Sequence, residues 1–209
     1  MSTPLPDPPI TKTPTRHPTT CLAVSTPLLS TLRRILPQKP LFTLSIGSGA
    51  GLLEALLAQH DHDHDLSATI AVEGVEVGSA VNRYIPEQDM HVVPGAWAVS
   101  GRALAAAAWL FVYPRDVGLV ARYLNISRGR DGERDLESGS GGGGRGEGEN
   151  EGNDPAVNVQ LVVWLGPRVD WPDYENVFTK SLFSELAFLG EAEGLAPYEV
   201  GVVARRRVS

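Results

Sequence analysis

The feature that most constrains the fold of this 209-residue chain is the segment 41–59. An apolar run suited to a buried parallel strand, residues 41–46, ends in the turn Gly-Ser-Gly-Ala-Gly at 47–51, and a helix-forming run, residues 52–59, follows at once. Glycines allow positive φ and a close approach of ligand to backbone, and the free N–H groups of the new helix face that ligand. The segment therefore predicts a strand, a glycine turn and a helix that bind a nucleotide-like molecule.

The next strand strengthens this interpretation because it ends in an acid. Residues 68–75 form an apolar run that is followed by Glu76. In an open α/β sheet, ligands bind outside the carboxyl ends of the strands. A carboxylate at the tip of the second strand can accept hydrogen bonds from two ribose hydroxyls. Glu76 is therefore a candidate ribose ligand.

Together the two motifs resemble those of the class I S-adenosylmethionine-dependent methyltransferases. In that family the first strand ends in a GxGxG loop and the second in an acid within a GVD-like step, which here reads Gly-Val-Glu at 74–76. The resemblance extends over roughly residues 40–125 and 156–205. It implies S-adenosylmethionine as the cofactor, with the glycines against its methionine part and Glu76 on its ribose. The residues that it places around the cofactor are Ser45, Gly47, Ser48, Gly49, Gly51, Glu76, Gly95, Ala96 and Trp97.

Two positions depart from the family pattern. The acid that often precedes the glycine loop by two residues is Ser45 here, and the acid expected after the third strand is replaced within residues 93–97. Trp97 would either stack on the adenine or serve in packing. Because of these departures, one alternative function is a non-catalytic scaffold that binds a partner. An NAD-type oxidoreductase is the other alternative, but its GxGxxG motif would need a glycine where Leu52 stands.

The acceptor site is expected after the fourth strand. Relatives that methylate amines commonly carry an Asn-Pro-Pro-aromatic motif there, whereas this chain has Tyr-Pro-Arg-Asp at 113–116. Tyr113 cannot replace the amide of that motif, which disfavours methylation of bases or exocyclic amines. Tyr113 and Asp116 are the candidate catalytic residues, although Asp116 also suits a helix N-cap. Methyl transfer depends mainly on alignment, so the acceptor, a small molecule or a protein, stays unidentified.

Apolar strands alternate with helix-forming runs along the rest of the chain. This alternation predicts an α/β fold with a mostly parallel sheet covered on both faces. The resemblance implies a Rossmann-like, doubly wound single domain whose last strand is antiparallel. We expect strands at 41–46, 68–75, 90–93, 109–113, 159–165 and 198–204, and helices at 25–36, 52–59, 79–85, 102–108, 116–124 and 174–188.

Two segments are expected to lie outside the domain, which would span residues 21–209. Residues 1–20 carry six prolines and six threonines and predict a disordered extension. The glycine-rich, charged residues 127–154 predict a disordered insertion. The run His-Asp-His-Asp-His-Asp at 60–65 contains metal-ligating residue types, but alternate residues converge on one ion only in an extended or wrapped segment. We expect a solvated loop there and no metal site.

Charge and cysteine usage limit the partners and the compartment. The net charge is −7, and residues 127–154, with four arginines against eight acids, account for −4 of it. Neither part resembles the basic footprint of a nucleic-acid-binding protein, so a nucleic-acid partner is disfavoured. No apolar run approaches the ~18 residues of a membrane span. The single cysteine, Cys21, fits a reducing location, cytoplasmic or nuclear. We expect part of the acceptor site to come from a protein partner or from the N-terminal segment.

Overall fold

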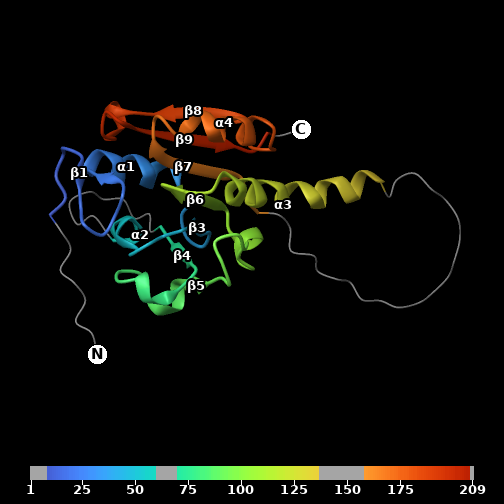
Figure 1. Cartoon of the computed structure of the whole chain (residues 1–209), viewed down its shortest axis with the longest axis horizontal. Coiled ribbons are helices and arrows are strands. Elements are labelled where there is room, and N and C mark those ends of the chain that lie inside the picture. Colours follow the sequence, from blue (N-terminus) through green and yellow to red (C-terminus); the bar gives the residue numbers. More distant parts are fainter. Residues whose placement is uncertain (1–8, 60–69, 137–157, 208–209) are drawn as a thin grey trace, which may run out of the picture.

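A mixed β-sheet organises the computed structural model, which describes residues 9–59, 70–136 and 158–207 (Figure 1). Within these residues the main sheet has seven strands, parallel up to β7 and antiparallel for β9 and β8. This confirms the predicted α/β, doubly wound, mostly parallel sheet with an antiparallel last strand. In order across the sheet, the strands are β5 (Met90–Val92), β4 (Val72–Glu76), β3 (Thr43–Ile46), β6 (Ala108–Val112), β7 (Leu161–Pro167), β9 (Glu199–Arg205) and β8 (Glu185–Leu189).

Helices cover both faces of this sheet. Successive side chains of a strand point to opposite faces, and β6 shows this directly. Trp109 and Phe111 belong to a core cluster that also includes residues of α3 and α4, whereas Leu110 belongs to a second cluster with α1 and α2. Because a strand such as β6 is apolar along its whole length, the sheet contributes side chains to one core on each of its faces. The helices are α1 (Thr26–Ile35), α2 (Leu52–Ala58), α3 (Val117–Leu136) and α4 (Trp171–Thr179), with 3-10 turns η1 (Ser79–Val81), η2 (Glu87–Asp89), η3 (Ala103–Ala105) and η4 (Glu191–Glu193).

Local sequence explains how α1 begins and how the larger core is fixed. The Ser25 hydroxyl accepts a hydrogen bond from the Leu28 N–H at 3.2 Å and donates one to the Gly194 carbonyl at 2.7 Å, so one side chain caps α1 and ties it to η4. In the α3 core, the Trp109 and Tyr123 rings meet edge to face with centroids 5.4 Å apart. The Tyr123 hydroxyl also accepts the Ser100 N–H at 3.0 Å. These contacts join α3 to the sheet and to the segment after β5.

Three of the predicted helices differ from the structure. Residues 79–85 form only the short turn η1, because the Asn82 side chain accepts the Ile85 N–H at 3.0 Å and replaces a helical bond. Residues 102–108 form the turn η3 and then enter β6, where pairing with β3 overrides the helix propensity of alanine. The helix predicted at 174–188 ends at Thr179, and residues 185–189 form the edge strand β8 paired with β9.

Parts of the two segments expected to be disordered have secondary structure within the described residues. Residues 15–16 form the strand β1 (Thr15–Arg16), which pairs with β2 (Ala23–Val24), and Thr26 N–H bonds the Thr11 carbonyl at 2.8 Å. Helix α3 continues through Leu136, beyond the expected start of the insertion at residue 127. Residues 1–8 and 137–154, like the His-Asp run at 60–65, lie outside the described residues. No helix in the described part of the chain is long and apolar enough for a membrane span.

Candidate functional site

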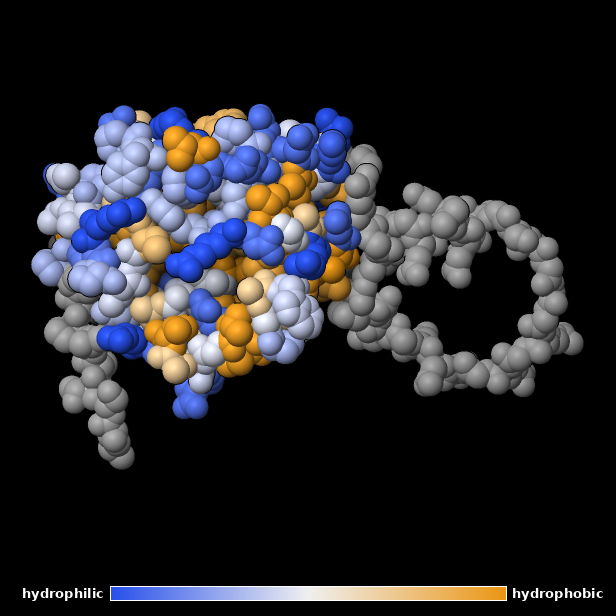
Figure 2. Space-filling view, viewed as in Figure 1, coloured by the Kyte–Doolittle hydropathy of each residue, from blue (hydrophilic) through white to orange (hydrophobic). Residues whose placement is uncertain are grey.

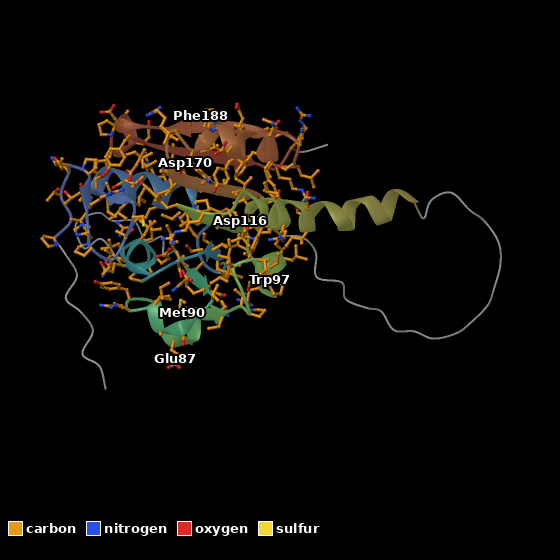
Figure 3. All side chains as sticks on the ribbon, viewed as in Figure 1. Glu87, Met90, Trp97, Asp116, Asp170 and Phe188 are labelled. Atoms are coloured by element: carbon orange, nitrogen blue, oxygen red, sulfur yellow. The ribbon has the colours of Figure 1, made fainter. Side chains whose placement is uncertain are left out.

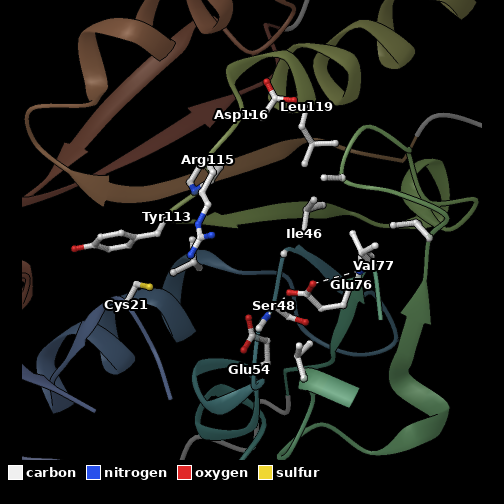
Figure 4. A pocket seen from close by; sticks show the side chains of 18 of the residues that line it. Cys21, Ile46, Ser48, Glu54, Glu76, Val77, Tyr113, Arg115, Asp116 and Leu119 are labelled. Carbon is white, nitrogen blue, oxygen red and sulfur yellow. Dashed lines mark hydrogen bonds between the residues drawn. The ribbon is translucent and has the colours of Figure 1, made fainter. Parts of the chain in front are cut away.

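A cavity of about 510 Å³ lies at the carboxyl ends of β3, β4 and β6 (Figure 4). Pockets of roughly 300–1,000 Å³ are typical of small-molecule sites. Each segment that the sequence places at this edge contributes lining residues: the glycine loop, the tip of β4, the segment after β5 and the turn after β6. The cavity is therefore the candidate ligand site.

The glycine loop has the geometry that a close ligand requires. Gly47, Gly49 and Gly51 have φ values of 75°, 59° and 81°, in the left-handed region that favours glycine. A Cβ built on Gly47 or Gly49 meets no protein atom within 4 Å, and both residues line the cavity. A Cβ on Gly51, which precedes α2, would instead collide with the Ile85 side chain. The first two glycines thus face open space, and the third is needed for packing.

Glu76 fixes the loop and lies in the cavity wall. Its Oε1 accepts the Gly49 N–H at 2.6 Å, and its Oε2 accepts the Val77 N–H at 3.3 Å. An ionised carboxylate has about four acceptor positions, so two bonds leave capacity for further donors. The Gly47 N–H bonds the Val75 carbonyl at 2.9 Å, which ties the loop to β4 a second time.

The carboxylate of Glu54, which the sequence analysis did not identify, also lines the cavity. Glu54 lies on α2 and is 2% exposed, and the Ser45 hydroxyl donates to its Oε1 at 2.6 Å. Burial raises the pKa of Glu54 from about 4.5 to about 7, and the nearby Glu76 adds to the shift while the Ser45 hydrogen bond opposes it. Among the described residues, no cation pairs with this carboxylate. Its signal in the sequence was one acid within the apolar run of α2.

The contact between Ser45 and Glu54 explains one departure from the pattern of the resembled family, the serine two residues before the glycine loop. The position that is often acidic in the resembled family holds a serine, but that serine binds an acid from the following helix. A carboxylate is thus present beside the glycine loop, although it comes from α2 rather than from β3. Ser45 itself is buried and acts by holding Glu54.

The segment after β5 contributes backbone and small side chains to the cavity. Gly95 and Ala96 line it, as predicted, together with Ala98. Trp97, labelled in Figure 3, is not among the lining residues and is 61% exposed. Its indole nitrogen lies 2.6 Å from the position of a Cβ on Gly95. The indole therefore folds back over Gly95 on the outside of the wall.

The two candidate catalytic residues line the cavity, but other groups already engage their side chains. The Tyr113 hydroxyl donates to Glu199 Oε1 at 2.7 Å, and burial together with this bond raises the pKa of Tyr113 above its ordinary value. Tyr113 therefore stays protonated and is no general base at neutral pH. The Asp116 Oδ1 accepts the Gly118 N–H at 2.7 Å at the start of α3, which is the N-cap role.

The N-terminal segment, one of the two sources considered for part of the acceptor site, supplies a wall of the cavity. Thr19, Thr20 and Cys21 line the cavity. The fully buried Glu199 on β9 holds this segment in place, because its Oε1 accepts the Ala23 N–H at 3.0 Å as well as the Tyr113 hydroxyl. The sequence does not identify these three residues, since the anchoring acid is 176 positions away from Ala23.

Metal ligands do not cluster at this site. Over the part of the chain that the structure describes, no three His, Cys, Asp or Glu residues come together in a way that could hold an ion.

Comparisons with known proteins identify the fold. No protein-family model matches the chain, and no protein of curated function matches its sequence. Among solved structures, precorrin-6y C5,15-methyltransferase from Geobacter metallireducens has a TM-score of 0.53 and 10% identity, with 90% of this chain and 92% of that chain covered. The small RNA methyltransferase HEN1 has a TM-score of 0.50 and 10% identity, with 87% of this chain and 25% of that chain covered. The chain thus has the Rossmann-like fold of the class I S-adenosylmethionine-dependent methyltransferases.

Proposed function

We propose that this protein is an S-adenosylmethionine-dependent methyltransferase whose acceptor, a small molecule or a protein, is unidentified. The observation that carries the proposal is the meeting of two open glycines, Gly47 and Gly49, with the carboxylates of Glu54 and Glu76 in one cavity of this fold. Fold alone does not define a function, so the chemistry of these residues must support the cofactor.

The residues fit S-adenosylmethionine in three respects. Glu76 at the tip of β4 has free acceptor positions for ribose hydroxyls. Gly47 and Gly49 leave space for the methionine part against the loop. Glu54 is a buried carboxylate without a cation of its own, and an ammonium group of a ligand would stabilise its charged form. In an NAD-type ligand the group that meets such a glycine loop is the anionic pyrophosphate, which an ionised Glu54 would repel, and this favours S-adenosylmethionine.

The protein has a limited task in such a reaction. S-adenosylmethionine supplies a methyl group that is electrophilic because its carbon is bonded to a positively charged sulfonium sulfur. The chain must hold an acceptor in line with that bond and exclude water, which can account for most of the rate gain. Tyr113 and Asp116 are part of the wall on the acceptor side, and we assign them positioning rather than proton transfer because their polar groups are already bonded.

The proposal predicts that Glu76→Gln weakens binding of S-adenosylmethionine and S-adenosylhomocysteine. Glutamine still offers an oxygen to the Gly49 N–H, but it loses the charge and part of the acceptor capacity needed by two hydroxyls. Each charged hydrogen bond lost should cost about 1.5–3 kcal/mol of binding free energy. Isothermal titration calorimetry of parent and variant measures the difference.

Glu73→Gln is the matched control, because Glu73 lies on the same strand but bonds Arg102 and His91 away from the main cavity. It should leave the affinity unchanged. Equal affinity of the Glu76→Gln variant and the parent would exclude the ribose role. A parent that binds neither S-adenosylmethionine nor NAD would favour the non-catalytic scaffold.

A further inference from the structure

The cavity has two sides of different charge. The carboxylates of Glu54 and Glu76 lie on the side of the glycine loop and β4, and Arg115 lies on the opposite side, in the turn after β6 (Figure 4). Asp116 also lines this second side, but its carboxylate accepts the Gly118 N–H and lies 3.9 Å from Arg122. In this view the guanidinium of Arg115 extends from the turn into the space above Ser48 and Glu54. A charge of opposite sign thus faces the part of the cavity that the cofactor residues leave open.

The turn that carries Arg115 is strained and firmly held. Tyr113 has a φ of 50°, which is uncommon for a residue with a side chain and is typical of functional sites where the surroundings enforce it. Its N–H bonds the Leu165 carbonyl at 2.7 Å, its hydroxyl bonds Glu199, and the Tyr174 hydroxyl bonds the Pro114 carbonyl at 2.6 Å. As a result, the Tyr113 hydroxyl is held by Glu199 of β9, while the Arg115 side chain extends into the cavity (Figure 4).

Arg115 also differs from the arginines near it. Within the described residues it has no hydrogen bond or ion pair, and it lines the cavity. Arg168 donates to the Glu199 carbonyl at 3.2 Å, and Arg122 lies 3.9 Å from the Asp116 carboxylate. Arg16 lies over the Tyr198 ring at 5.6 Å. Those three are used within the fold, whereas Arg115 is available to a ligand.

The remaining lining indicates the kind of ligand. Thr19 and Thr20 add hydroxyl groups to the wall, and most of the other side chains on this side are apolar. Next to Arg115 the apolar lining residues are Val112, Pro114 and Leu119. On the β4 side of the cavity, Val77 and Val81 are exposed at the rim, and Figure 2 shows apolar patches in the lower half of the molecule, where β4 and β5 lie. A guanidinium binds a carboxylate or a phosphate through two parallel hydrogen bonds.

We propose that the methyl acceptor is a small, largely apolar molecule with a carboxylate or phosphate group, and that Arg115 binds this group. The inference rests on the proposed function, because it places the cofactor against the glycine loop and leaves the Arg115 side to the acceptor. Arg115 is then a specificity-determining residue: the ion pair fixes one end of the acceptor and the apolar wall orients the rest.

The test uses the full chain saturated with S-adenosylhomocysteine and three probes of similar size. Benzoate carries the carboxylate, phenyl phosphate carries the phosphate, and benzamide is the neutral control. Calorimetric or NMR titration should show binding of at least one anion and weaker or no binding of benzamide. Arg115→Gln should reduce the anion affinity at least about tenfold, which corresponds to about 1.4 kcal/mol. Arg34→Gln, an exposed arginine on α1 outside the cavity lining, should leave it unchanged.

Four outcomes would overturn the inference. Anion binding that is equal in Arg115→Gln and the parent, or absent from the parent, excludes an anion site at this residue. Weaker S-adenosylhomocysteine binding in Arg115→Gln, with methylthioadenosine binding unchanged, assigns Arg115 to the carboxylate of the cofactor instead. Because Arg115 is exposed, its replacement should leave the melting temperature unchanged.

A parent that fails to bind S-adenosylhomocysteine overturns the proposed function together with this inference, whereas cofactor binding without anion binding overturns this inference alone.

Discussion

Glu54→Gln should stabilise the ligand-free protein above pH 7 and at the same time weaken its binding of S-adenosylmethionine. The carboxyl group is 2% exposed, and burial raises its pKa from about 4.5 to about 7. Ionising it inside the fold therefore costs free energy that the unfolded chain does not pay. A shift of this size corresponds to roughly 3 kcal/mol of lost stability at high pH. Glutamine has a similar shape and can accept the Ser45 hydrogen bond without carrying a charge.

The dependence on pH gives this prediction a definite sign. Below about pH 4.5 the carboxyl group is protonated in both the folded and the unfolded chain, and the parent keeps the full contribution of the raised pKa. Between about pH 4.5 and pH 7 only the unfolded chain ionises, so the stability of the parent falls as the pH rises. Above pH 7 the loss is complete. The stability gain of Glu54→Gln should therefore be small at pH 5 and approach its maximum at pH 8.

Urea denaturation of parent and variant at pH 5 and pH 8 measures the stability part, and titration calorimetry at pH 8 measures binding. Glu73→Gln gives the opposite control. Burial alone would raise the pKa of Glu73, but hydrogen bonds from Arg102 and His91 lower it below its ordinary value, so removing its charge should reduce stability at pH 8. A Glu54→Gln protein that is less stable than the parent at pH 8 would contradict the buried, unpaired carboxylate. Unchanged cofactor affinity would remove Glu54 from the binding site.

The pairing of these two effects has a functional meaning. A group that destabilises the free protein and stabilises a complex is typical of a binding site, where strongly perturbed pKa values are common. Glu54 meets this description through geometry as well as charge, since it lies beside the glycine loop and is held by Ser45.

The parts of the fold that the sequence predicts well depend on local chemistry. The buried strand β3, the three left-handed glycines and α2 follow one another without a gap, and each residue type has few alternatives there. Glu76 is likewise predicted because a strand end, rather than a distant contact, fixes its position. These features locate the glycine-loop side of the cavity from sequence alone.

The parts that the sequence does not predict depend on distant partners. Glu54 is one acid in an apolar helix, and only the folded chain shows that its carboxyl group is buried and bonded to Ser45. Residues 15–24 contain little apolar periodicity, and they are ordered by pairing with each other and by Glu199, far along the chain. The helix expected at 174–188 ends early because residues 185–189 complete the sheet beside β9. In each case tertiary contacts outweigh a weak local preference.

Gly49→Val should abolish measurable binding of S-adenosylmethionine while the protein still folds. The left-handed φ of 59° is unfavourable for a β-branched residue and should cost about 1–3 kcal/mol of stability. No protein atom lies within 4 Å of the new Cβ, so the fold has room for the side chain. That room is the cavity itself, and the valine methyl groups would occupy the space assigned to the ligand. We expect an affinity loss of at least about a hundredfold, or about 2.7 kcal/mol.

Two other glycines separate this effect from a general loss of structure. Gly51→Ala should chiefly reduce the melting temperature, because its Cβ collides with Ile85 at a φ of 81° and Gly51 does not line the cavity. Gly101→Ala should change neither property, since its Cβ meets nothing within 4 Å and its φ is not positive. Circular dichroism and thermal melting establish that each variant is folded, and calorimetry with S-adenosylmethionine then measures binding. A folded Gly49→Val protein with the affinity of the parent would show that the open space beside Gly49 is not occupied by the cofactor, and the loop would then serve only to turn the chain from β3 into α2.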